Sequence, residues 1–334
     1  MVPIVALTLL SAGFVLALGL EWLVWRGSLR LGVLAHPTGR SSHLVATPTA
    51  GGIAIVVPVV GYLIWLGLLG SQPAAALAAG GLALAAIGLW DDLREVSPLL
   101  RLLMHALAAA ALVAVSMPQS AWIVLAVAGF ALVWQINLYN FMDGIDGLAG
   151  AQGLVFLVGA QIVGQGVPGW PGDVMWLSAG ALLAFLVFNW PPARIFMGDV
   201  GSGFLGLLTG ALALLLWQQQ TLPLAVSLIL LCGFWFDATY TLMIRLVTGQ
   251  AFTQAHRSHL YQKVAAQRGH LWTTSAFLVY AAVWLLPLAW LCAAASPEMP
   301  QALWWIALAA APLAAAAWWF GAGLPAGGAH QSHD

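Results

Sequence analysis

The sequence predicts an all-α, polytopic integral membrane protein with 10–11 transmembrane helices. Of its 334 residues, 62% are hydrophobic and only 6% are charged, and the mean hydropathy is +0.94. Few soluble domains approach this composition. Apolar runs close to the length that crosses ~30 Å of hydrocarbon recur along the whole chain, so its helices are expected to span a bilayer repeatedly.

Eleven apolar segments follow one another, with short polar loops between them. They cover residues 3–25, 51–70, 75–90, 99–117, 121–138, 148–167, 174–190, 200–217, 223–245, 272–294 and 302–321. Several are nearer to about 17 residues than 20, the short end for a membrane span. No soluble domain interrupts the series, so residues 1–321 are expected to form a single transmembrane domain. Residues 322–334 contain Gly, Ala and His and are expected to be a disordered tail on the cytoplasmic side.

The basic residues predict how these helices are oriented. All ten Lys and Arg residues lie in or beside alternate loops, and loops rich in Lys and Arg stay on the cytoplasmic side of a membrane. The amino terminus is then outside and the tail inside. The net charge of −1 gives no indication of the basic surface that nucleic-acid binding requires. The loops predicted to be cytoplasmic are residues 26–50, 91–98, 139–147, 191–199 and 246–271.

Residues 135–150 gather polar side chains at the end of the fifth segment. Asn137, Asn140, Asp143 and Asp146 recur at three-residue steps, which places them near one face of a helix or of its last turns. Glycines among them allow tight turns or a close approach to a ligand. This stretch indicates a site for carboxylate chemistry beside the membrane.

Further acidic residues fall on the same predicted side. Asp91 and Asp92 close the third segment, and Asp199 precedes the eighth. Any one of them could merely cap a helix or solvate a loop. Together their negative charges need a positive partner, because an unpaired carboxylate at the centre of a membrane helix costs roughly 2.5–3.5 kcal/mol. A shared divalent cation, Mg²⁺ or alternatively Mn²⁺, would provide it with oxygen ligands and substrate phosphates, which favours phosphoryl transfer.

Two other motifs suit phosphate but are ambiguous when taken alone. Residues 196–203 place Asp199 and several glycines at a helix start, where free N–H groups could receive an anion. Such glycines more often serve close helix packing. His256, Arg257 and His259 form a patch that could grip phosphate, and the simpler interpretation is a basic loop that faces anionic lipid.

Five ordered motifs resemble the polyprenyl-phosphate N-acetylhexosamine-1-phosphate transferases, a membrane superfamily also known as glycosyltransferase family 4. The His-Arg-Ser-His-Leu-Tyr-Gln form of the last motif is most similar to the branch that initiates O-antigen or capsule synthesis. The motifs are Ser41–Gly52, Asp91–Asp92, Asn137–Leu148, Asn189–Asp199 and His256–Gln262.

The resemblance implies an enzyme that moves an amino-sugar 1-phosphate from a UDP-sugar to undecaprenyl phosphate and releases UMP. It also implies a bacterial inner membrane protein with a periplasmic amino terminus and an active site on the cytoplasmic face. A homodimer is compatible with it.

The resemblance further implies residue roles. Asp199 would bind Mg²⁺, Asp91 would be the base for the lipid phosphate, and Asp92 would assist at the metal or at that phosphate. The remaining implied residues are Asp143 and Asp146 in the catalytic group, and Asn137, Asn140, Asn189, Phe196, His256, Arg257 and His259 in substrate binding.

One departure and two alternatives stand beside this interpretation. No Lys lies between Ser41 and Gly52, where many relatives would carry a basic residue, and Arg40 or His43 are the candidate replacements. An ion-coupled transporter also uses membrane carboxylates and interrupted helices, but it would place its site at the midplane between repeats. A lipid phosphotransferase with another nucleotide donor is the nearer alternative.

Overall fold

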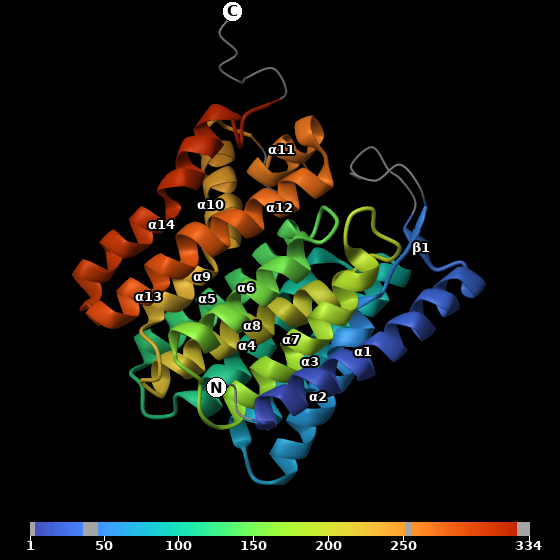
Figure 1. Ribbon diagram of the computed structural model, residues 1–334, viewed down its shortest axis with the longest axis horizontal. Helices are drawn as coiled ribbons and strands as arrows, with labels where there is room; N and C mark the ends of the chain where they lie inside the picture. Colours follow the sequence, from blue (N-terminus) through green and yellow to red (C-terminus); the bar gives the residue numbers. More distant parts are fainter. Residues whose placement is uncertain (1–3, 36–45, 251–255, 326–334) are drawn as a thin grey trace, which may run out of the picture.

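The computed structural model describes residues 4–35, 46–250 and 256–325, and it confirms an all-α membrane architecture (Figure 1). One short hairpin is the exception among these residues. The long helices are α1 (Ile4–Leu31), α2 (Gly52–Leu68), α3 (Gln72–Leu93), α4 (Pro98–Ser116), α5 (Trp122–Met142), α6 (Leu148–Val163), α7 (Gly169–Asn189), α8 (Asp199–Gln218) and α14 (Met299–Trp319). The shorter ones are α9 (Leu224–Leu230), α10 (Cys232–Val247), α11 (Leu260–Arg268), α12 (His270–Tyr280), the π-helix η1 (Ala281–Leu285) and α13 (Leu286–Ala295).

Within the described residues, eight helices are long and apolar enough to cross a membrane. Helices α9 and α10 add a ninth span if the pair, which is bent by 76°, is counted as one. Helices α2 and α6 have only 17 and 16 residues, or about 24–26 Å at 1.5 Å per residue. Each of the eleven predicted segments thus corresponds to one helix or to consecutive helices, but α2 and α6 fall short of a full span.

The first loop that was predicted to be cytoplasmic begins later than residue 26. Helix α1 continues to Leu31, and Arg26 lies on this helix with its guanidinium 4.2 Å from the centre of the Trp22 ring. A two-residue hairpin follows, in which β1 (Leu34–Ala35) pairs antiparallel with β2 (Thr47–Pro48). Strands this short carry no periodic pattern, so the sequence did not predict them.

Close crossings of helices hold the bundle together. A Cβ atom added at Gly13 of α1 would collide with the backbone of Leu177 in α7, and one added at Gly180 would collide with Leu10. Small residues at such crossings are the usual means of packing membrane helices, because lipid tails are as apolar as Leu. Helix α8 lies at the centre against α3 and α5, and nearly all of its residues are buried.

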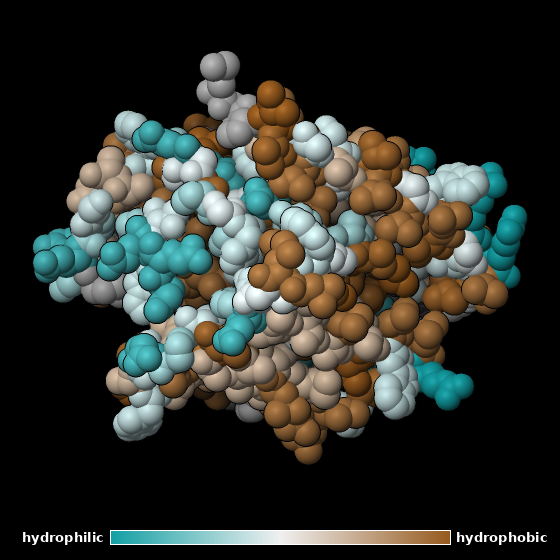
Figure 2. Space-filling view, turned by 90° about the horizontal axis from the view of Figure 1, so that it is seen from below, coloured by the Kyte–Doolittle hydropathy of each residue, from teal (hydrophilic) through white to brown (hydrophobic). Residues whose placement is uncertain are grey.

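The outer surface matches a membrane setting. Figure 2 shows apolar residues across the middle of one face and hydrophilic residues gathered toward its two ends. Helices α13 and α14 lie at the edge of the molecule opposite α1 and α2 (Figure 1).

Candidate active site

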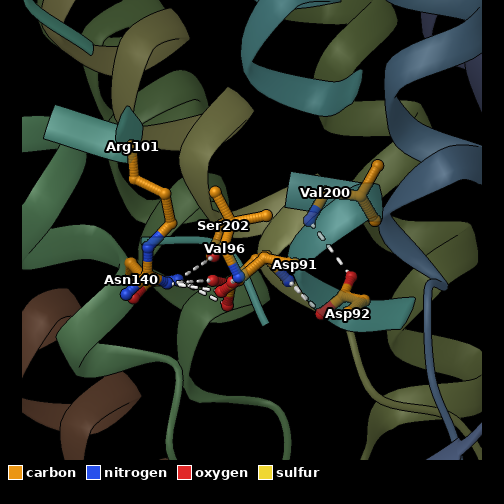
Figure 3. A network of polar contacts seen from close by, with 8 residues as sticks. Asp91, Asp92, Val96, Arg101, Asn140, Val200 and Ser202 are labelled. Carbon is orange, nitrogen blue, oxygen red and sulfur yellow. Dashed lines mark hydrogen bonds and ion pairs between the residues drawn. The ribbon is translucent and has the colours of Figure 1, made fainter. Parts of the chain in front are cut away.

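The predicted acidic residues meet where four helix ends come together. Arg101, at the start of α4, donates from one nitrogen to Asp91 at 2.5 Å and to Asp199 at 2.9 Å. Asp91 lies at the end of α3 and also accepts the N–H of Val96 at 2.7 Å. From α5, Asn140 donates to the other carboxylate oxygen of Asp199 at 2.7 Å. Figure 3 shows Arg101 and Asn140 on one side of this network and Asp92 on the other.

Asp92 caps helix α8. Its carboxylate accepts the N–H groups of Asp199 at 3.0 Å and Val200 at 3.4 Å. The next two N–H groups of the helix already donate to the carbonyl of Gly198. The predicted anion site at this helix start is therefore wrong, because its donors are used within the protein. The contacts of Asp92 are those of an N-cap, the simpler of the two interpretations of this residue.

Three glycines explain how the chain brings Asp199 to this position. Gly198 has φ +73°, a conformation that favours glycine, and an added Cβ would collide with Asp92. Gly52 touches Gly201 so closely that a Cβ on either would collide with the other backbone. Gly52, the first residue of α2, thus serves backbone packing at the start of α8.

Backbone hydrogen bonds complete this junction. Phe196 donates its N–H to Pro48 at 2.8 Å and accepts the N–H of Gly51 at 2.9 Å, and Met197 accepts from Gly52 at 2.8 Å. The segment around Phe196 is consequently fixed to the end of the hairpin. Arg40 and His43, the candidate replacements for the missing Lys, lie outside the described residues.

We predict that Gly88→Ala strongly reduces activity. An added Cβ at Gly88 of α3 would collide with the carbonyl and the following amide of Asp199, so α8 would have to move away from Asp91. Gly129→Ala is the matched control, because nothing lies within 4 Å of a Cβ at Gly129 in α5. Normal activity of the purified Gly88 variant would contradict close α3–α8 packing at the site.

A cavity of about 690 Å³ opens beside the network. Its apolar lining residues include Leu84, Ile87, Leu102 and Leu242. Its polar lining residues include Arg101, His105 and Gln262. Five of the residues predicted from the sequence also line the cavity, namely Asn137, Asn140, Asp199, His256 and His259.

Asp143 adds another carboxyl group to the site. Its carboxylate, which is partly exposed, makes no hydrogen bond within the described parts of the chain. Burial raises the pKa of Asp143 well above its usual value, and the nearby charges of Asp199, Asp92 and Asp146 raise it further. A site with this excess of carboxylate favours a bound cation.

The oxygen donors of this site fit Mg²⁺. Asp91 and Asp199 converge on one positive charge, and carboxylate and amide oxygens are the ligands that Mg²⁺ prefers. No group of three or more His, Cys, Asp or Glu side chains among the described residues is arranged to hold a metal by itself. Since Mg²⁺ is typically held by one or two carboxylates with substrate phosphates, the donor set suits an ion that arrives with a substrate.

Asp146 and Asn189 stabilise the wall of the site and do not line the cavity. Asp146 accepts the N–H of Ala193 at 3.0 Å and lies 3.1 Å from the Nδ1 atom of His270. Asn189 is buried, accepts the N–H of Gly147 at 2.8 Å and donates to the carbonyl of Ile195 at 2.8 Å. Both ends of the Asn189 amide are thus used in fixing two loops, and its predicted role in substrate binding stays a prediction.

The His-containing loop is held by an acid in α10. Asp237 is buried and accepts the N–H groups of Leu260 at 2.8 Å and Tyr261 at 2.9 Å, so it caps α11 from a different helix. His259 precedes α11 and forms a capping box with Gln262. The rings of His256 and His259 are 5.0 Å apart, and both residues line the cavity.

The charge of this loop differs from a simple basic patch. Burial, together with the nearby His259 and Arg245, lowers the pKa of His256 to about 4. His256 is thus neutral near pH 7 and can meet a phosphate as a hydrogen-bond donor but not as a cation. Arg257 is exposed and supplies the fixed positive charge.

Two residues important to this geometry were not among those predicted for the site. Arg101 is one of the ten basic residues of the alternate loops, and in the structure it joins Asp91 to Asp199. Asp237 is an acid within an apolar segment, and its partners lie 23 and 24 positions further along the chain. An acid or a base beside a membrane helix was the available signal in both cases.

Comparison with known proteins is consistent with this site. Residues 74–217 match the family described as glycosyl transferase family 4. A probable undecaprenyl-phosphate N-acetylglucosaminyl 1-phosphate transferase of Bacillus subtilis is 27% identical over 264 residues, which are 73% of each chain. A phospho-N-acetylmuramoyl-pentapeptide-transferase of Synechococcus is 34% identical over 277 residues, 69% of this chain and 75% of the relative. A decaprenyl-phosphate N-acetylglucosaminephosphotransferase of Mycolicibacterium smegmatis is 34% identical over 55% of this chain and 53% of its own length.

Proposed function

The chain belongs to glycosyltransferase family 4, the polyprenyl-phosphate sugar-1-phosphate transferases, and from this membership we propose that it moves an N-acetylhexosamine 1-phosphate from a UDP-sugar to undecaprenyl phosphate. In the net reaction, an oxygen of the acceptor phosphate bonds to the phosphorus that carries the sugar. The bond between that phosphorus and the oxygen of UMP breaks, and UMP leaves. The product is a lipid-linked sugar pyrophosphate.

The observation that carries this proposal is a cavity lined by both polar and apolar side chains. Arg101, Asn140 and Asp199 suit phosphate groups and their cation, while Leu84 and Leu242 suit a prenyl chain. An acceptor with a charged head and a hydrocarbon tail needs both kinds of lining at once. A water-soluble donor needs only the polar kind.

Residue roles follow from the contacts. We assign to Asp199 the binding of Mg²⁺ with phosphate oxygens, and a bound ion would offset the charge of the donor pyrophosphate. Arg101 lines the cavity between two carboxylates, and its guanidinium can donate a hydrogen bond to a phosphate oxygen. Asp91 keeps the role of base at the lipid phosphate, a task of modest difficulty because a phosphate monoester is already largely ionised at pH 7.

The proposal includes the place of the reaction and its purpose. The distribution of Lys and Arg supports a periplasmic amino terminus and an active site on the cytoplasmic face of a bacterial inner membrane. The form of the motif at His256–Gln262 supports initiation of O-antigen or a related lipid-linked polysaccharide.

The direct test is release of UMP by the detergent-purified protein given polyprenyl phosphate, Mg²⁺ and a panel of UDP-sugars. We expect UMP with at least one N-acetylhexosamine donor, and mass spectrometry of the lipid product identifies the sugar. Turnover only with a different nucleotide donor would favour the lipid phosphotransferase alternative. Absence of turnover with every UDP-sugar would overturn the proposal.

A further inference from the structure

The last described residues of the chain fold back onto the His-containing loop. We name Gly321–Leu324 the C-terminal clasp and His256–His259 the substrate loop. Lys263 of α11 donates to the clasp carbonyls of Gly321 at 2.5 Å and Leu324 at 3.1 Å. Figure 1 shows the end of α14 beside α10 and α11, where this contact forms.

Gly323 forms one hydrogen bond with the substrate loop and one with Gln250, which precedes that loop. Its N–H donates to the carbonyl of Ser258 at 2.8 Å, and its carbonyl accepts from the side chain of Gln250 at 2.8 Å. Gln250 is itself held by Arg245 at 2.9 Å. The clasp is therefore bonded to residues before, within and after the substrate loop.

The clasp is packed as well as bonded. Ala322 is 2% exposed and joins a small apolar cluster with Leu260 and Val264 of α11. Gly323 has φ +80°, and an added Cβ would lie 2.6 Å from the Cβ of Ile244. Only glycine meets both requirements without strain, so the contact depends on the residue at this position.

We propose that the C-terminal clasp is a positioning element for the substrate loop. Ser258 connects the two, since its carbonyl accepts from Gly323 while its hydroxyl lies 3.0 Å from Nδ1 of His256. Fixing the backbone of Ser258 fixes the orientation of the His256 ring, which lines the cavity. This inference rests on the proposed function for its kinetic consequence, because His256 and Arg257 of the substrate loop would contact the phosphates of the UDP-sugar.

Two truncated chains test the proposal. A chain that stops after Phe320 lacks the clasp, while a chain that stops after Pro325 keeps it and is the matched control. We expect the first to raise KM for the UDP-sugar about tenfold, the effect of losing a hydrogen bond to a charged or fixed group, with a smaller change in kcat. Lys263→Met should shift KM in the same direction, and Lys263→Arg should restore much of it.

Hydrogen–deuterium exchange of residues 256–262 provides a readout that needs no turnover. We expect exchange there to increase when the clasp is removed and to stay unchanged in α3 and α8. Gly323→Val should give the same local increase as the truncation. If the exchange and KM of both shortened chains equal those of the full chain, the positioning role is wrong. Failure of the full chain to turn over any UDP-sugar would instead refute the proposed function and leave the exchange result to decide on the clasp.

Discussion

Asp199→Asn is expected to abolish transfer, with at least about a 100-fold loss of kcat. Metal stabilisation of the charge on a phosphoryl group is worth several kcal/mol, and each ~1.4 kcal/mol changes a rate about tenfold. The amide keeps the size of the side chain and can still meet Arg101 or Asn140 through its oxygen. The loss would therefore report the missing carboxylate charge. Residual activity of the variant should also require more Mg²⁺ than the wild type.

A matched control comes from the opposite end of the same bundle. Asp173 lies near the start of α7 and accepts the hydroxyl of Tyr62 at 3.2 Å, outside the cavity described above. Asp173→Asn should retain transfer and Mg²⁺ dependence. Near-normal activity of Asp199→Asn would remove this residue from the metal site. Equal losses in both variants would indicate general damage to the protein.

The membrane helices could be predicted from the sequence because spanning a bilayer is a local requirement. Each span must satisfy its own backbone hydrogen bonds and present apolar side chains, so hydropathy alone locates it. The 76° bend between α9 and α10 has no such signal, since Leu231 stands at the break and no proline is present there. Its position depends on packing against other helices, which a single segment does not record.

The division of roles between neighbouring acids could not be predicted. Asp91 and Asp92 are adjacent and of one residue type, yet Asp91 pairs with Arg101 while Asp92 caps α8. The difference depends on how α3 is rotated against α8, and Gly88 sets that contact. Asp146 and Asn189 show the same limitation, because their partners belong to loops that meet only in the folded chain.

Asp91→Asn is expected to stop transfer while leaving UDP-sugar binding nearly unchanged. A positioned base contributes about 10²–10⁴-fold to the rate of a proton transfer, and that contribution is lost with the carboxylate. In the wild type the Asp91 carboxylate accepts the N–H of Val96 at 2.7 Å, and the amide oxygen of the variant can still accept it. The end of α3 should therefore stay in place. Single-turnover transfer and equilibrium binding of the UDP-sugar measure the two effects separately.

The contact with Arg101 gives this experiment its alternative outcome. If Asp91 acts only by holding Arg101, the variant should lose donor affinity, because the guanidinium would no longer be fixed toward the cavity. A loss confined to nucleotide binding would thus contradict the base role.

Asp92→Asn is the comparison variant. We expect it to cost about 1 kcal/mol of stability through the weakened cap of α8, measurable as a lower melting temperature in detergent. A melting temperature that falls as far in Asp91→Asn would mean that both neighbouring acids are structural.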